Sequence, residues 1–94
     1  MKQEQLRKLI RNIEHFGTSV ELDKSIEECE ELIDEIKKYK NDSGCIENLV
    51  DEIADVKVML AQLEIIFDCS GAVEDRVEFK INRQMERIAS LKNP

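Results

Sequence analysis

The stretch from residue 46 to residue 67 constrains the fold most, because fourteen of its 22 residues are apolar. These residues point in every direction around a helical axis, so we expect a helix over about 46–68 that is buried all round. A chain of 94 residues forms one domain with a modest core, since it hides only about 60–70% of its unfolded surface. That core is too small to cover such a helix from every side. The sequence therefore predicts a homo-oligomer, either a dimer or a tetramer.

Three amphipathic helices are expected beside it, because apolar residues recur there every three or four positions. Turn-forming Gly, Asn, Asp and Ser residues separate the helices. Only three Gly and one Pro occur, which is too few for the turns of an all-β fold. The prediction is an all-α fold, a small four-helix bundle in a single domain of residues 1–94. The expected helices span about 2–16, 22–40, 46–68 and 72–91, with breaks at Gly17, at 41–44 and at Ser70-Gly71.

The charge balance disfavours nucleic-acid and membrane partners. Twenty-one acidic residues face fourteen basic ones, a formal charge of −7, which repels phosphate backbones and anionic lipids. No apolar run reaches the ~18 residues of a membrane span, and the first residues lack the apolar stretch of a signal peptide. Cys29, Cys45 and Cys69 form neither a Cys-x-x-Cys pair nor a zinc pattern. We therefore expect free thiols in a cytoplasmic protein.

Two pairs of carboxylates mark the candidate site. Glu28 and Glu31 lie three residues apart on the second expected helix, and Glu52 and Asp55 repeat that spacing on the third. Apolar Met59 continues the stripe of the second pair, and burying ionised carboxylates costs several kcal/mol unless a cation pairs with them. Two such pairs on neighbouring helices can converge into an oxygen-rich cage, which suits Mg²⁺ better than zinc. The alternative for the acidic stripe of the second helix is a solvated face.

The histidine content excludes a di-iron site. Four-helix di-iron proteins need a Glu-x-x-His motif from each of two helices. This chain has one histidine, His15, and Asn12 occupies the position three residues before it. We expect His15 to be a capping or surface residue.

A cationic ridge follows the last expected helix. Its members, at positions i, i+4, i+7 and i+11, are Arg76, Lys80, Arg83 and Arg87. Adjacent like charges do not stabilise a helix by themselves. Two explanations stay open: the ridge pairs with acidic residues on another helix, or it binds the β- and γ-phosphates of a nucleotide, for which Arg offers forked contacts and Lys a point charge.

The segments EECEEL (27–32) and DEIADV (51–56) together resemble the paired motifs of MazG-like, all-α nucleoside triphosphate pyrophosphohydrolases. The last helix, around FKINR (79–83), looks like the basic helix of that family. By position, the resemblance implies that Glu28, Glu31, Glu52 and Asp55 serve catalysis and hold Mg²⁺, with Mn²⁺ as an alternative ion. The expected substrate-binding residues are Lys24, Lys80, Arg83 and Arg87.

The resemblance implies a Mg²⁺-dependent enzyme that cleaves a ribo- or deoxyribonucleoside triphosphate to the monophosphate and pyrophosphate, as housecleaning of the nucleotide pool. One alternative is a non-enzymatic acidic helical module for self-association or interaction. A second is an acidic decoy that mimics nucleic acid. The stretch between the motif helices, 37–48, is short and leaves little material for a base pocket, so base and sugar preference stay open.

Overall fold

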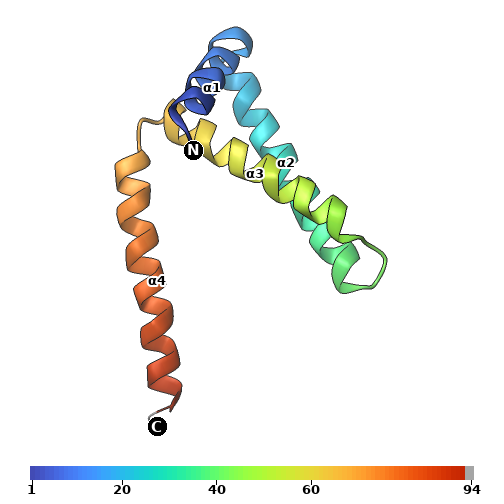
Figure 1. The fold of residues 1–94 in the computed structure, drawn as a ribbon, viewed down its shortest axis with the longest axis vertical. Coiled ribbons are helices and arrows are strands. Elements are labelled where there is room, and N and C mark those ends of the chain that lie inside the picture. Colours follow the sequence, from blue (N-terminus) through green and yellow to red (C-terminus); the bar gives the residue numbers. More distant parts are fainter. Residues whose placement is uncertain (93–94) are drawn as a thin grey trace.

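The protein is a chain of four helices joined by short turns, in a computed structural model that describes residues 1–92. The helices are α1 (Gln3–Phe16), α2 (Thr18–Lys40), α3 (Ile46–Ile66) and α4 (Ser70–Lys92), and no strand occurs in the described part (Figure 1). The predicted all-α class with four helices is confirmed. None of the helices over residues 1–92 combines the length and the apolarity needed to cross a membrane.

One residue separates α1 from α2. Gly17 has a φ of 90°, its N–H donates to the Ile13 carbonyl at 2.8 Å, and its own carbonyl accepts from the Glu21 N–H at 3.2 Å. Glycine takes this positive φ without the steric penalty that a Cβ brings. The break at Gly17 is confirmed. The expected start of the second helix near residue 22 is late, because the helix resumes directly at Thr18.

The other two breaks lie in turns with a left-handed residue. Asp42, at a φ of 59°, lies in the turn after α2, where the sequence predicted one. Between α3 and α4 the chain reverses at Asp68, with a φ of 48°, and aspartate tolerates this region. The predicted break at Ser70-Gly71 is wrong by about one turn, since both residues belong to the start of α4.

The core lies in the hairpin of α2 and α3, with α1 packed on its upper end (Figure 1). Met59 of α3, at 5% exposure, is the one apolar residue that is buried among those the structure describes. The other buried side chains are polar and surround the same level of the hairpin: Glu21, Ser25 and Gln62. The buried residues of this chain are thus mostly polar, whereas an ordinary core is mostly apolar. We therefore look for a functional site in the groove between α2 and α3, where these polar residues lie.

In the single chain, α3 is not buried all round, contrary to the expectation from its composition. The hairpin partner α2 and the short α1 cover only part of its circumference, while α4 turns away from it. Apolar side chains on its open sides remain at least 40% exposed, namely Ile46, Val50, Ile53, Val58, Leu60 and Phe67.

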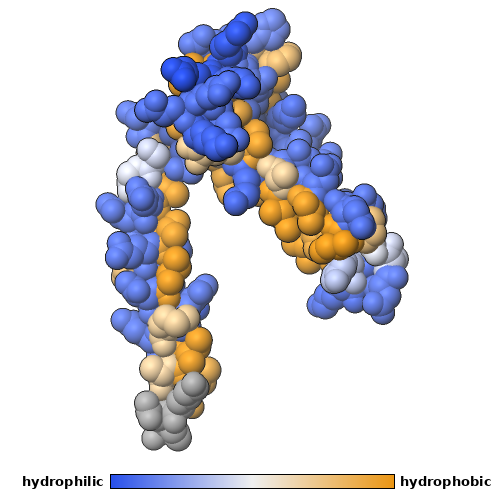
Figure 2. Space-filling model, viewed as in Figure 1, coloured by the Kyte–Doolittle hydropathy of each residue, from blue (hydrophilic) through white to orange (hydrophobic). Residues whose placement is uncertain are grey.

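The fourth helix extends away from the other three and meets α3 only near its own start (Figure 1). Residues 70–91 are all exposed, so one chain by itself does not close a four-helix bundle. Figure 2 shows an apolar band along the side of α4 that faces the α2–α3 arm. The exposed large apolar residues of α4 are Val73, Val77, Phe79, Ile81, Met85, Ile88 and Leu91.

Candidate functional site

Four carboxylates converge across the α2–α3 hairpin. Glu28 and Glu31 come from α2, Glu52 and Asp55 come from α3, and one oxygen of each lies within 4.8 Å of the corresponding oxygens of the others. The three-residue spacing puts both members of a pair on one helix face. The tight turn at 41–45 makes the helices antiparallel, so Glu28 lies near Asp55 and Glu31 near Glu52.

The electrostatics of this carboxylate group are unfavourable without a cation. Burial raises the pKa of Glu28, and the charges of Asp55 and Glu31 raise it further. Burial also raises the pKa of Glu52, with Glu31 and Asp55 adding to the shift. In both residues the Oε2 atom is shielded from solvent and has no hydrogen-bond partner among the described residues. Such orphaned polar atoms are rare and costly, so they indicate a missing partner.

The donor set fits a hard divalent cation. Mg²⁺ binds oxygen at about 2.0–2.1 Å, which places ligands on opposite sides of the ion about 4 Å apart. The 4.8 Å span of the carboxylate group matches this with small side-chain movements. The group contains no histidine or cysteine, the ligands that zinc prefers. Exposed acidic clusters are common without an ion; in this one, Glu28 and Glu52 are partly buried and each has a shielded oxygen without a hydrogen-bond partner.

Lys24 lies on the same side of the hairpin as the carboxylate group. It lines a small cavity together with Glu28 and Asp55, and its charge lowers the pKa of Glu28 against the larger raising effect of burial. The exposed ammonium group can therefore reach an anion bound at the carboxylates.

The cationic ridge of α4 does not reach the carboxylate group within one chain. Lys80, Arg83 and Arg87 are exposed on α4, and they form no ion pair with the described residues of the same chain. Arg76, the first member of the ridge, lies 4.4 Å from the centroid of the Phe79 ring in a cation–π contact. The pairing of Lys80, Arg83 and Arg87 with acidic residues on another helix of the same chain is not formed among the described residues.

Sequence reasoning missed a buried polar group next to the carboxylates. Asn12 Nδ2 of α1 donates to Glu21 Oε1 at 3.1 Å, and Ser25 Oγ donates to the Glu21 carbonyl at 2.8 Å. The sequence contained a pattern that could have predicted this group. Polar residues occupy positions i, i+4 and i+7 on one face of α2, namely Glu21, Ser25 and Glu28. Gln62 lies seven residues after Asp55, which puts both on the same face of α3.

His15 and the three cysteines agree with the sequence prediction of a surface residue and of free thiols. The acids adjacent to the motif positions, Glu27, Glu30 and Asp51, are exposed. His15 is an exposed residue whose ring lies edge-on to Phe16 at 4.6 Å. The three cysteines are free thiols.

Glu35 of α2 makes an ion pair with Lys38 at 3.2 Å, but its second carboxylate oxygen is buried without a partner. It lies one turn beyond Glu31 on α2, outside the group of four.

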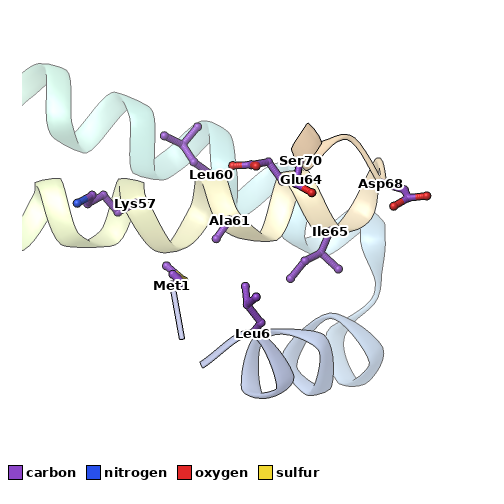
Figure 3. Close-up of a pocket in the computed structure, with 9 residues that line it drawn as sticks. All are labelled: Met1, Leu6, Lys57, Leu60, Ala61, Glu64, Ile65, Asp68 and Ser70. Atoms are coloured by element: carbon purple, nitrogen blue, oxygen red, sulfur yellow. The ribbon is translucent and has the colours of Figure 1, made fainter. Parts of the chain in front are cut away.

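A larger cavity of about 790 Å³ lies between the N-terminal segment, α1 and α3. Figure 3 shows Leu6 and Ile65 bordering it from different helices. Its α3 residues, which include Lys57, Leu60 and Ala61, point away from the face that carries Glu52 and Asp55, as helical geometry requires. The cavity is mainly an apolar hollow on the opposite side of α3 from the carboxylates.

The structure thus gathers the four predicted metal ligands and Lys24 on one face of the hairpin, and leaves the α4 ridge apart from them. No family model, curated protein or solved structure matches the chain. The chemistry of the site therefore rests on its geometry.

Proposed function

We propose that the protein is a Mg²⁺-dependent nucleoside triphosphate pyrophosphohydrolase of the MazG-like kind. It would cleave ribo- or deoxyribonucleoside triphosphates between the α- and β-phosphates, in nucleotide-pool housecleaning. The observation that carries this proposal is the pair of shielded, unpartnered oxygens, Glu28 Oε2 and Glu52 Oε2, inside a group of four converging carboxylates. A site with this excess of negative charge binds a polyanion only through a cation.

The four carboxylates and Lys24 would have different roles in this reaction. Glu28, Glu31, Glu52 and Asp55 hold the ion, which when bound neutralises phosphate oxygens and makes water more acidic. A carboxylate oxygen that is not engaged with the ion accepts the proton of the attacking water. Lys24 offers a positive charge to the phosphates.

We also propose that the working form is a homo-oligomer, a dimer or a tetramer. Support comes from the apolar band of α4 and the open sides of α3, which together expose more apolar surface than a monomer ordinarily leaves uncovered. In an assembly, α4 of one copy covers the hairpin of another and carries Lys80, Arg83 and Arg87 toward the phosphates. The free thiols favour a reducing compartment, so we place the protein in the cytoplasm.

The alternative is a non-enzymatic acidic helical module that assembles through the same apolar surfaces. The exposure of the apolar residues of α4, among them Val77, Ile81 and Met85, favours it, because an apolar face that its own chain leaves open is suited to binding another chain. This alternative predicts no metal dependence and no turnover.

The test is direct. The protein is incubated with Mg²⁺ and a mixture of ribo- and deoxyribonucleoside triphosphates, and the products are identified by phosphorus NMR. We expect monophosphate and pyrophosphate in equal amounts, and no product when the metal is chelated. Release of inorganic phosphate with a diphosphate, or no product under any condition, would contradict the proposal.

A further inference from the structure

The single chain exposes more surface than a compact protein of its length. Its accessible surface is 7768 Å², whereas a compact monomer of this size exposes about 5,600 Å². Its radius of gyration is 16.7 Å, against about 12 Å for a compact domain of similar length. The excess area is larger than the roughly 800 Å² that each partner buries in a standard interface. It is therefore large enough to be the contact surface of a second copy of the chain.

One apolar stripe of α2 has no cover in the chain. Ile26 and Ile33 lie about 140–160° around α2 from Glu28, which points toward α3, and they are 59% and 49% exposed. We call the apolar residues on this side the outer stripe of α2: Leu22, Ile26, Cys29, Ile33 and Ile36. Within the chain α4 meets only α3, near its own start (Figure 1). The outer stripe and the apolar band of α4 thus both lack a partner.

A row of acids follows one edge of the outer stripe. Each acid comes one residue after a member of the stripe, as Glu27 follows Ile26. The acidic row consists of Asp23, Glu27, Glu30 and Asp34. All four are exposed, and none forms an ion pair with the described residues of the same chain.

The cationic ridge of α4 has the same spacing as the acidic row, because both sets occupy positions i, i+4, i+7 and i+11. The cations lie on the other edge of their apolar band, since Lys80 comes one residue before Ile81. When two helices pack through apolar stripes, a following edge on one meets a preceding edge on the other only if the helices run parallel. Charges at such edges set the direction of helix pairing. The two rows therefore select a parallel arrangement.

We propose that α4 of a second copy docks along the outer face of α2 and runs parallel to it. Its apolar band covers the outer stripe, and its cationic ridge lies along the acidic row. Apolar burial supplies most of the affinity, because exposed ion pairs contribute little each. The inference rests on the self-association in the proposed function and names the surface that receives α4. Glu27 and Glu30 adjoin Glu28 and Glu31, so the docked ridge lies beside the carboxylate group.

Cys29 of the outer stripe makes the contact testable by disulfide cross-linking. In a background with Cys45→Ser and Cys69→Ser, Ile81→Cys should form an intermolecular disulfide with Cys29 on mild oxidation, detected on a non-reducing gel and located by peptide mass spectrometry. Phe79→Cys is the matched control. Phe79 is 51% exposed and Ile81 is 53% exposed, but the two lie about 160° apart around α4, so the control should link far less.

Charge reversal tests the same pairing without new cysteines. Glu27→Lys and Lys80→Glu should each weaken self-association by about fivefold or more, since each turns an exposed attraction into a repulsion. The double variant should recover most of the wild-type dissociation constant, measured by sedimentation equilibrium. Glu14→Lys makes the same charge change at an exposed position of α1 and should leave association unchanged. A double variant that associates no better than the single ones would overturn the parallel docking.

Failure of this inference is distinguishable from failure of the proposed function. A stable oligomer in which Ile81→Cys links to Cys29 no better than Phe79→Cys does would overturn the docking surface, while pyrophosphate release by that oligomer would still support the enzyme. Selective cross-linking between copies at Ile81→Cys, without pyrophosphate release from any triphosphate, would support the docking surface and contradict the enzyme. A wild-type monomer would overturn both the docking and the proposed self-association.

Discussion

Glu31 of α2 faces Glu52 of α3, and after burial the Glu31 carboxylate is the largest influence that raises the pKa of Glu52. The hairpin thus holds two like charges opposite each other. On an isolated helix the same side chains could turn away from each other into solvent. Coulomb repulsion from the Glu31 carboxylate opposes the ionisation of Glu52. The arrangement persists because the apolar neighbours of both helices fix it, and it predisposes the site to bind a cation.

The pH dependence of stability should reveal this repulsion. The folded-state pKa values of Glu28 and Glu52 lie above the ordinary 4.5, so the folded protein binds protons that the unfolded chain releases. The contribution of these groups is fully present below pH 4.5, and it is lost as the pH rises through their raised values. With divalent metal removed by a chelator, the free energy of unfolding of Glu52→Gln should fall less with rising pH than that of the wild type. Urea unfolding of both proteins between pH 4.5 and 8 measures this difference. If the two free energies of unfolding changed with pH in parallel, the prediction would be contradicted.

Divalent cations should stabilise the protein by mass action. A ligand at 100 times its dissociation constant adds about 2.7 kcal/mol to the free energy of unfolding, which for a chain of this size raises Tm by about 10–20 °C. Thermal unfolding with increasing Mg²⁺ or Mn²⁺ measures the effect. Glu52→Gln should respond less. If the wild-type melting temperature stayed unchanged at metal concentrations that saturate typical Mg²⁺ sites, the four carboxylates would not be a metal site.

Loss of any one metal ligand should impair turnover far more than folding. Glu28→Gln, Glu31→Gln, Glu52→Gln and Asp55→Asn each keep the side-chain shape and remove one anionic oxygen. We expect kcat/KM to fall at least about a hundredfold, since each ligand positions the charge that stabilises the transition state. Glu30→Gln is the control, because Glu30 is an exposed acid on the same helix. Equal pyrophosphate release by Glu52→Gln and Glu30→Gln would rule out this assignment.

The ridge on α4 should contribute to phosphate binding. Arg83→Ala is expected to weaken triphosphate binding or turnover by about 1.5–3 kcal/mol, the scale of a charge-assisted hydrogen bond, and Lys80→Ala by a similar amount. Arg7→Ala, at an exposed position of α1, provides the control. If the two α4 variants retained full activity but lost thermal stability, the ridge would be a salt-bridge surface of the assembly.

The apolar band of α4 should hold copies of the chain together. Sedimentation at micromolar concentration is expected to show a dimer or a tetramer. Ile81→Lys introduces a charge in the middle of the band, where Ile81 is 53% exposed in the single chain, and should shift the protein toward monomer. A wild-type chain that sediments as a stable, compact monomer would refute self-association.

The convergence of the carboxylates could be anticipated from the sequence because it depends on local rules. Helical periodicity places Glu28 with Glu31, and Glu52 with Asp55, and the turn formers at 41–44 join the two helices as a hairpin. Nothing local determines where α4 points, because its apolar stripe would serve an intramolecular partner and a second copy equally well. The bond from Asn12 to Glu21 was also beyond prediction, since it depends on how α1 folds back on the hairpin.

The turn at Gly17 sets the rotation of α1 against the α2–α3 hairpin. A side chain at this position would meet no atom within 4 Å, so its cost arises from the φ of 90° alone. Inserting one residue there would rotate α1 by about 100° about its axis and withdraw Asn12 from Glu21. The length of this one-residue turn therefore sets whether the buried Glu21 carboxylate keeps its hydrogen bond from α1, so an insertion far from the four carboxylates would leave a buried charge without a donor.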